Sequence, residues 1–169
     1  MSELRLESAF ATLVRHRVDF VVVGGVAGVL YGAPFTTQDL DLVYSRAPEN
    51  VARLARAMAE LEARYVDPAG RHIVPDEAKL AALRVHLLET TCGRLDLLTT
   101  IPPNLPYERL IAEATSLTLG EIDISVVNLG VLIESKEKLG RPKDRYQVLY
   151  LREIEAQRTR GSIGDGQGR

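Results

Sequence analysis

The chain has 169 residues, 46% of them hydrophobic and 26% charged, a composition that predicts one soluble globular domain with a single core. The formal net charge of −2 excludes the strong basic excess of a nonspecific nucleic-acid binder. The longest apolar run, residues 18–30, is interrupted by Asp19 and by glycines and is too short for a membrane-spanning helix.

The N-terminal residues and the cysteine usage favour a cytoplasmic protein. The chain begins with an amphipathic segment of mixed charge, without the basic start, apolar middle and cleavage site of a secretory signal. Cys92 is the only cysteine, which excludes an internal disulfide, and no cysteine and histidine residues have zinc-site spacing. Its neighbours Thr91 and Gly93 indicate a turn, where Cys92 is a small structural residue rather than a catalytic thiol.

Hydrophobic periodicity predicts alternating helices and strands in the first half of the chain. Residues 3–16 repeat apolar positions at helical spacing. The continuous apolar run 18–23 indicates a buried strand, which Gly24 and Gly25 end. Residues 39–44 alternate with period two and predict a strand with carboxylates on one face. Two helices complete this half, over residues 27–31 and from Pro48 to about Tyr65.

The second half is predicted to contain two hairpins and several helices. Residues 66–76 indicate a loop and residues 101–106 a rigid connector, because both are rich in proline. One hairpin joins strands 85–88 and 94–98, and another spans 117–127 at the sheet edge. The predicted helices cover residues 76–83, 107–114, 129–139, which follows the N-cap Asn128, and 142 to about 157.

This order of elements predicts an α/β (α+β) fold in which helices flank one mixed β-sheet. The chain shows no internal repeat and no second core. We therefore expect a single domain over residues 1–158. Residues 159–169 have little hydrophobic periodicity and are predicted to be a disordered tail.

Asp39 and Asp41 are the first unusual feature, because they lie two residues apart on a predicted strand and therefore leave the same face. Two like charges so placed repel each other, and a hard divalent cation such as Mg²⁺ relieves that repulsion. The alternative is a strand with a solvated acidic face. Asp96, among leucines on another predicted strand, adds a third carboxylate if the two strands pair.

The diglycine Gly24-Gly25 lies just upstream of the acidic strand, between a buried strand and a helix. Small residues at such a junction free backbone N–H groups, which can point at an anion. A triphosphate at this turn and its metal at the carboxylates would then be neighbours. The motif alone is weakly specific, but its position before the acidic strand favours a nucleotide site.

Three segments in this order, Val23–Ala27, Thr36–Leu42 and Gly93–Leu98, resemble the signature of the DNA polymerase β-like nucleotidyltransferase superfamily. The chain is similar to small bacterial nucleotidyltransferase-like proteins related to abortive-infection toxin enzymes, over about residues 10–155. The resemblance implies the nucleotidyltransferase fold and a cytoplasmic enzyme that transfers a nucleoside monophosphate to a hydroxyl acceptor. The acceptor would be RNA, a protein or a small molecule, and the enzyme could be the toxin of a toxin–antitoxin pair.

The resemblance also implies roles for individual residues. Gly24 and Gly25 would bind the phosphates of a nucleoside triphosphate such as ATP. The three carboxylates of Asp39, Asp41 and Asp96 would bind Mg²⁺ or Mn²⁺ and act in catalysis. The chemistry implied is attack of the acceptor hydroxyl on the α-phosphate with release of pyrophosphate.

The C-terminal part supplies cations. Residues 134–169 carry nine Lys/Arg against six Asp/Glu, whereas residues 1–133 carry 12 against 17. Lys136, Arg141 and Lys143 resemble the basic segment that toxin-like relatives place against the nucleotide, and Arg141 could clamp two phosphate oxygens. The alternative is a solvated basic turn that pairs with neighbouring glutamates.

One feature departs from the pattern of the toxin-type relatives, many of which have an arginine just before the acidic strand. This chain has Thr36 and Thr37 there, so phosphate contact from that side falls to these threonines or to the backbone.

Two other functions stay open at the level of the sequence. One is a catalytically silent nucleotide-binding or regulatory protein with the same fold. The other is a purely structural or interaction domain, which a structure with Asp96 far from Asp39 and Asp41 would favour. Three motifs in the order that one site requires favour the enzyme.

Overall fold

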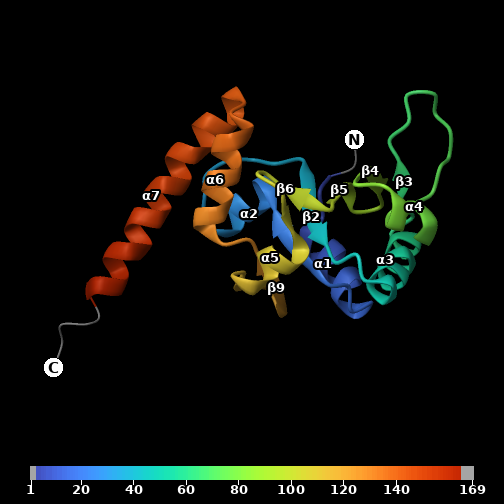
Figure 1. Ribbon diagram of the computed structural model, residues 1–169, viewed down its shortest axis with the longest axis horizontal. Helices are drawn as coiled ribbons and strands as arrows, with labels where there is room; N and C mark the ends of the chain where they lie inside the picture. The colour runs from blue at the N-terminus through green and yellow to red at the C-terminus, as the bar shows by residue number, and fades with distance from the viewer. Residues whose placement is uncertain (1–2, 165–169) are drawn as a thin grey trace.

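The computed structural model describes residues 3–164, and a seven-stranded mixed sheet with the order β3-β4-β5-β2-β1-β9-β8 organises them (Figure 1). Its strands are β1 (Phe20–Val23), β2 (Asp39–Tyr44), β3 (Arg64–Tyr65), β4 (Val85–Thr90), β5 (Gly93–Leu98), β8 (Thr115–Leu119) and β9 (Ile122–Val126). A separate two-stranded ribbon comprises β6 (Thr100–Ile101) and β7 (Leu105–Pro106). The predicted fold class, a mixed sheet flanked by helices, is confirmed.

The helices are α1 (Leu6–Arg15), α2 (Gly24–Leu30), α3 (Pro48–Glu60), α4 (Glu77–Ala82), α5 (Tyr107–Ala112), α6 (Leu129–Leu139) and α7 (Pro142–Gly164). In Figure 1, α6 and α7 lie together on the left beside α2, whereas α3 and α4 lie on the right, below β3. Among the described residues, no helix combines the length and apolarity needed to cross a membrane.

The sheet is mixed at its centre, where β2 lies between β1 and β5. β1 is buried along its whole length and pairs with β2 in antiparallel register. β5 runs parallel to β2 on the other side, with Asp41 opposite Asp96. β2 is thus held by hydrogen bonds along both edges, which fixes the position of the acidic residues on it.

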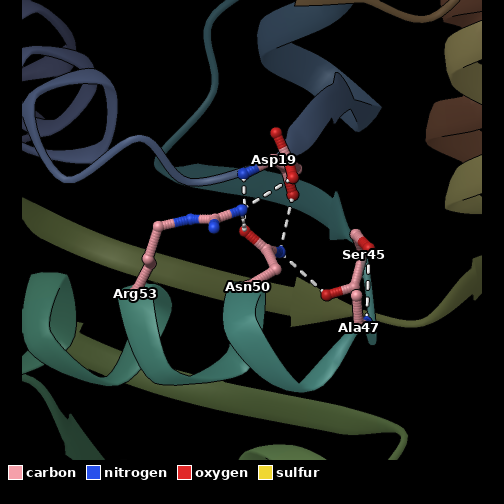
Figure 2. Close-up of polar contacts among 5 residues, drawn as sticks. All are labelled: Asp19, Ser45, Ala47, Asn50 and Arg53. Atoms are coloured by element: carbon pink, nitrogen blue, oxygen red, sulfur yellow. Dashed lines mark hydrogen bonds and ion pairs between the residues drawn. The ribbon is translucent and has the colours of Figure 1, made fainter.

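A buried asparagine joins the two central strands to α3 (Figure 2). Asn50 has no exposed surface, and its Oδ1 accepts a hydrogen bond of 2.7 Å from the Asp19 backbone N–H. Its Nδ2 donates to the carbonyl oxygens of Asp19 at 3.0 Å and Ser45 at 2.8 Å. One amide thereby satisfies backbone groups just before β1 and just after β2, which sequence periodicity did not reveal.

His86 is a core residue and lies on the face of the sheet opposite the carboxylates. Its Nδ1 lies 2.7 Å from the Tyr65 hydroxyl and its Nε2 3.0 Å from the Tyr44 hydroxyl. Because the Tyr44 hydroxyl donates to the Leu80 carbonyl, this network assigns the hydrogen to Nε2. Burial lowers the pKa of His86, so the neutral ring is favoured.

Several element boundaries differ from the sequence prediction. α2 begins at Gly24 directly after β1, so the diglycine forms the first helical turn rather than a loop before a helix at 27. β3 and the β6–β7 ribbon were not predicted. α7 continues to Gly164, although a disordered tail was predicted from residue 159; the rest of that predicted tail, 165–169, lies outside the described residues.

Candidate active site

The three predicted carboxylates share one face of two adjacent strands. Asp39 and Asp41 are two residues apart on β2, and Asp96 lies directly opposite Asp41 in the parallel β2–β5 register. Residues opposite each other in neighbouring strands present their side chains on the same face. Arg94 lies opposite Asp39 in the same way. Asp96 therefore lies beside Asp41, whereas a distant Asp96 would have favoured the alternative of an incidental acidic strand.

The ionised forms of the carboxylates in this cluster are disfavoured. Burial, together with the charges of Asp96 and Asp39, raises the pKa of Asp41 to about 7, against the lowering effect of Lys136 and Lys143. Burial and the charge of Asp39 likewise raise the pKa of Asp96. Carboxylates that share a site in this way resist simultaneous ionisation unless a cation compensates them.

Two oxygens of the cluster lack partners. Within residues 3–164, Asp39 Oδ1 and Asp96 Oδ1 are buried without a hydrogen bond. Arg94 Nε lies 3.4 Å from Asp39 Oδ1, close enough for an ion pair but outside hydrogen-bond geometry. No three or more His, Cys, Asp or Glu residues of the described chain form a ready-made metal site. Unpartnered carboxylate oxygens on one face nevertheless fit the donor set that a hard divalent cation prefers.

Gly24 is in contact with the Asp41 carboxylate. Its φ of +65° lies in the left-handed region, and a Cβ built on it would lie 2.3 Å from Asp41 Oδ2. A Cβ on Gly25 would lie 2.8 Å from the Thr37 hydroxyl oxygen. Both positions therefore require glycine for close approach. The first turn of α2 and the acidic strand form one continuous surface.

This contact predicts the effect of Gly24→Ala. The methyl group would meet a carboxylate on a fixed strand and would strain the backbone, so we expect a loss of about 2 to 4 kcal/mol in the free energy of unfolding. Gly70→Ala is the matched control, because Gly70 has a φ of +70° but no atom within 4 Å of the added Cβ. It should cost only about 1 kcal/mol. Equal losses in urea denaturation of the two variants would contradict the contact.

The basic segment of α6 and α7 closes the other side of the site. Lys136 is 5% exposed, and its Nζ donates a 2.6 Å hydrogen bond to Gln147 Oε1 and lies 3.7 Å from Asp144 Oδ1. Burial lowers the pKa of Lys136, opposed by the nearby charges of Asp144 and Asp41. Lys136 is therefore buried and within the electrostatic influence of Asp41, in contrast to the alternative interpretation of a solvated basic turn.

Arg141 and Asp144 form the outer part of this segment. The Asp144 side chain is fully buried and accepts hydrogen bonds from Arg141 Nε at 2.6 Å and from Nη2 at 3.2 Å. Arg141, the predicted phosphate clamp, is thus already paired with Asp144 in the first turn of α7. Lys143 lies near enough to lower the pKa of Asp41. Asp144 and Gln147 were missed in the sequence, where they read as ordinary polar helix positions.

The two threonines before β2 differ in position. The Thr37 hydroxyl donates to the Asp39 carbonyl oxygen at 3.1 Å and lies against Gly25. Thr36 is exposed. Arg94 is the other residue that the sequence analysis missed, although its spacing from Asp96 on the same strand would have placed both on one face.

Comparisons with solved structures match the fold of this chain to nucleotidyltransferases. A candidate nucleotidyltransferase of Thermotoga maritima superposes with a TM-score of 0.54 at 15% identity, over 97% of each chain. The antibiotic-resistance factor ANT(2'')-Ia matches in its solution structure with a TM-score of 0.51 at 12% identity, over 95% of this chain and 92% of that one. Its crystal structure with adenylyl-2''-tobramycin matches with a TM-score of 0.52 at 13% identity, over 91% and 92%.

The chain therefore has the nucleotidyltransferase fold. No protein-family model matches it, and no curated protein does. At 12 to 15% identity the likeness defines the fold, and the chemistry has to be argued from the residues of the site.

Proposed function

We propose that this protein is a Mg²⁺-dependent nucleotidyltransferase that moves a nucleoside monophosphate from a nucleoside triphosphate such as ATP to a hydroxyl acceptor. The observation that carries the proposal is the position of Asp41, which lies opposite Asp96 and touches Gly24, within the field of Lys136 and Lys143. The Asp41 carboxylate thus lies next to the acidic cluster and the glycine turn, and two lysines act on its charge. The solved structures with this fold support transfer chemistry in general.

The acidic cluster would hold the metal. Asp39, Asp41 and Asp96 have the oxygens for Mg²⁺ or Mn²⁺, and two of these oxygens have no partner among the described residues. A divalent cation bound there would neutralise the phosphate charge that develops during transfer. It would also lower the pKa of Asp41 by relieving the repulsion from its neighbours.

The triphosphate would lie between the glycine turn and the basic segment. Gly24 and Gly25 allow close approach to backbone N–H groups, and Thr37 borders the same turn. Lys136 and Lys143 face the cluster from α6 and α7 and would compensate the phosphate charge. Arg141 would take part only by exchanging its hydrogen bonds to Asp144 for phosphate oxygens.

The proposed reaction is one displacement at the α-phosphorus. The acceptor oxygen forms a bond to this phosphorus while the bond to the oxygen that bridges the α- and β-phosphates breaks, and pyrophosphate leaves. Asp96 takes the proton of the acceptor hydroxyl.

An assay with α-labelled nucleotides tests the proposal. We expect Mg²⁺-dependent incorporation of label from one of the four nucleoside triphosphates when total RNA, cell lysate and small hydroxyl compounds are offered as acceptors. Asp39→Asn should reduce it at least about a hundredfold, because removing a metal-binding charge removes transition-state stabilisation. Glu121→Gln, in the exposed turn between β8 and β9, is the control and should retain full activity.

Undiminished labelling by Asp39→Asn would overturn the metal role of this carboxylate. Mg²⁺-dependent nucleotide binding by calorimetry without label in any acceptor would instead support a silent nucleotide-binding protein. The finer assignments, a toxin of the abortive-infection type with an antitoxin partner and a cytoplasmic location, stay predictions from the sequence. Growth arrest on expression that Asp39→Asn abolishes would support the toxin role.

A further inference from the structure

A pocket of about 1040 Å³ adjoins the acidic cluster on the side away from the basic segment. Its walls are the residues before β2, the ends of β4 and β5, the N-terminal segment and the loop after β3. The residues that the argument uses are Thr37, Glu62, Arg64, Glu89 and Arg94. Arg94 connects the pocket to the site, because it also forms the ion pair with Asp39.

Sheet register places the pocket on the face that carries the carboxylates. Asp39 lies opposite Arg94, Arg94 opposite Glu89, and Glu89 opposite Arg64. Side chains that are opposite in successive strands lie on one face, so these four residues form a row of alternating charge from β2 to β3. The row ends beside the loop that rises at the upper right of Figure 1.

The next row of the same face runs from Asp41 and Asp96 to exposed apolar side chains. Leu87 lies opposite Asp96 and is 45% exposed, and its carbonyl oxygen accepts a hydrogen bond from the N–H of Val66, just after β3. The face of the sheet beyond Asp96 is therefore uncovered. A triphosphate between Gly24 and Lys136 approaches from β1, so an acceptor has to reach the α-phosphorus over β5 and β4.

The charge around the pocket disfavours a polyanionic acceptor. Its lining contains three glutamates and two arginines; Arg64 is paired with Glu89 and Arg94 with Asp39, which leaves Glu3 and Glu62 as the lining charges outside these pairs. Glu62 forms no ion pair with any described residue. A ligand with positive charge and several hydroxyl groups complements such a surface.

Glu62 has a conformation that glycine normally adopts. It follows α3 with a φ of +50°, in the left-handed region where a side chain is disfavoured. A glutamate at this position costs stability relative to glycine. Glu62 is one of the residues that line the pocket, which suggests a functional reason for its presence.

We propose that this pocket is the acceptor site and that the acceptor is a small, positively charged polyhydroxyl compound rather than RNA or protein. The inference rests on the proposed function, since the acceptor hydroxyl has to meet the α-phosphorus beside Asp96. The volume suits a ligand of two or three sugar rings. Threonine, glutamate and arginine side chains supply both donors and acceptors for its hydroxyl groups.

A series of trisaccharides matched in size tests the charge preference. The probes are the glucosamine trimer, which is cationic, the N-acetylglucosamine trimer, which is neutral, the galacturonate trimer, which is anionic, and total tRNA. With Mg²⁺ and labelled nucleotide, we expect the cationic trimer to be labelled at least about tenfold faster than the neutral one, and no labelling of the anionic trimer or tRNA.

Calorimetry separates failure of this inference from failure of the proposed function. If nucleotide binds with Mg²⁺ but the glucosamine trimer does not bind, or if tRNA is the preferred acceptor, the acceptor site is overturned and the proposed function stands. If no nucleotide binds, the proposed function fails. Binding of the glucosamine trimer then tests the pocket by itself, and no binding overturns the acceptor site as well.

Variants of the pocket complete the test. Glu3→Gln and Glu62→Gln should each raise KM for the cationic trimer about tenfold and leave KM for the nucleotide unchanged, because both glutamates line the pocket and neither forms an ion pair with a described residue. Glu62→Gly should raise Tm or leave it unchanged and still raise KM, which a purely structural role for Glu62 would not produce. Glu121→Gln is the control. Unchanged KM in all three pocket variants would overturn the proposal.

Discussion

Replacement of Asp41 by asparagine should stabilise the metal-free protein and abolish nucleotidyl transfer. Burial and two neighbouring carboxylates raise the pKa of Asp41 to about 7 from 3.8, so its ionised form is unfavourable in the folded state. At pH 8 the folded protein has to carry this charge, and Asp41→Asn removes it. We expect the free energy of unfolding to rise by about 2 kcal/mol or more, because each pKa unit corresponds to about 1.4 kcal/mol.

The sign of the pH dependence follows from the raised pKa. Between pH 4 and pH 7 the folded protein binds a proton at Asp41 that the unfolded chain has released, so the contribution of this group to stability decreases as the pH rises. The advantage of Asp41→Asn should therefore shrink when urea denaturation is repeated at pH 5. Mg²⁺ should raise the Tm of the native protein at pH 8 but not that of the variant. A variant less stable than the native protein at pH 8, with Glu121→Gln unchanged, would contradict this account.

Asn50→Leu should cause the largest loss of stability outside the site. Leucine has the same branched arrangement of side-chain heavy atoms but leaves the Asp19 N–H and the Ser45 carbonyl oxygen without the partners that Figure 2 shows. Each buried backbone group without a partner costs about 1 to 3 kcal/mol. We expect a total loss of about 3 to 5 kcal/mol in urea denaturation.

Glu49→Gln is the control for this variant, because Glu49 is the exposed neighbour in the same helix turn. It should change the free energy of unfolding by less than about 0.5 kcal/mol. A loss below about 1 kcal/mol in Asn50→Leu would mean that water replaces the asparagine amide, contrary to its complete burial.

The sequence predicted those parts of the fold that have strong hydrophobic periodicity or a clear capping residue. The alternation over Asp39–Tyr44 predicted β2 correctly, and Asn128 caps α6 as expected, its Oδ1 accepting from the Gly130 N–H at 2.9 Å. β3 has only two residues, which is too short for a period of two to be visible. α2 begins earlier than predicted because packing of Gly24 against Asp41 on β2 and of Gly25 against Thr37 just before it outweighs the low helix propensity of glycine.

The parts of the candidate site whose residues lie on a single strand were predictable from the sequence. The spacing of Asp39 and Asp41 placed both on one face, and their convergence with Asp96 needed only the pairing of β2 with β5. The environment of Lys136 was not predictable, because its burial depends on Gln147 and Asp144 from the next helix. The pocket depends on contacts between β3, β4 and the N-terminal segment, which no local pattern encodes.

The central position of β2 separates two kinds of evolutionary change. The carboxylates lie on β2 and β5, each of which has a neighbouring strand on both sides. Substitutions in these two strands would disturb the proposed transfer step. The short outer strand β3 and the loop that follows it contribute only to the rim of the pocket, and substitutions or insertions in them would leave the inner strands in place. Under the proposed function, descendants of this chain could therefore exchange one acceptor for another by remodelling the sheet margin while the carboxylates stay in place.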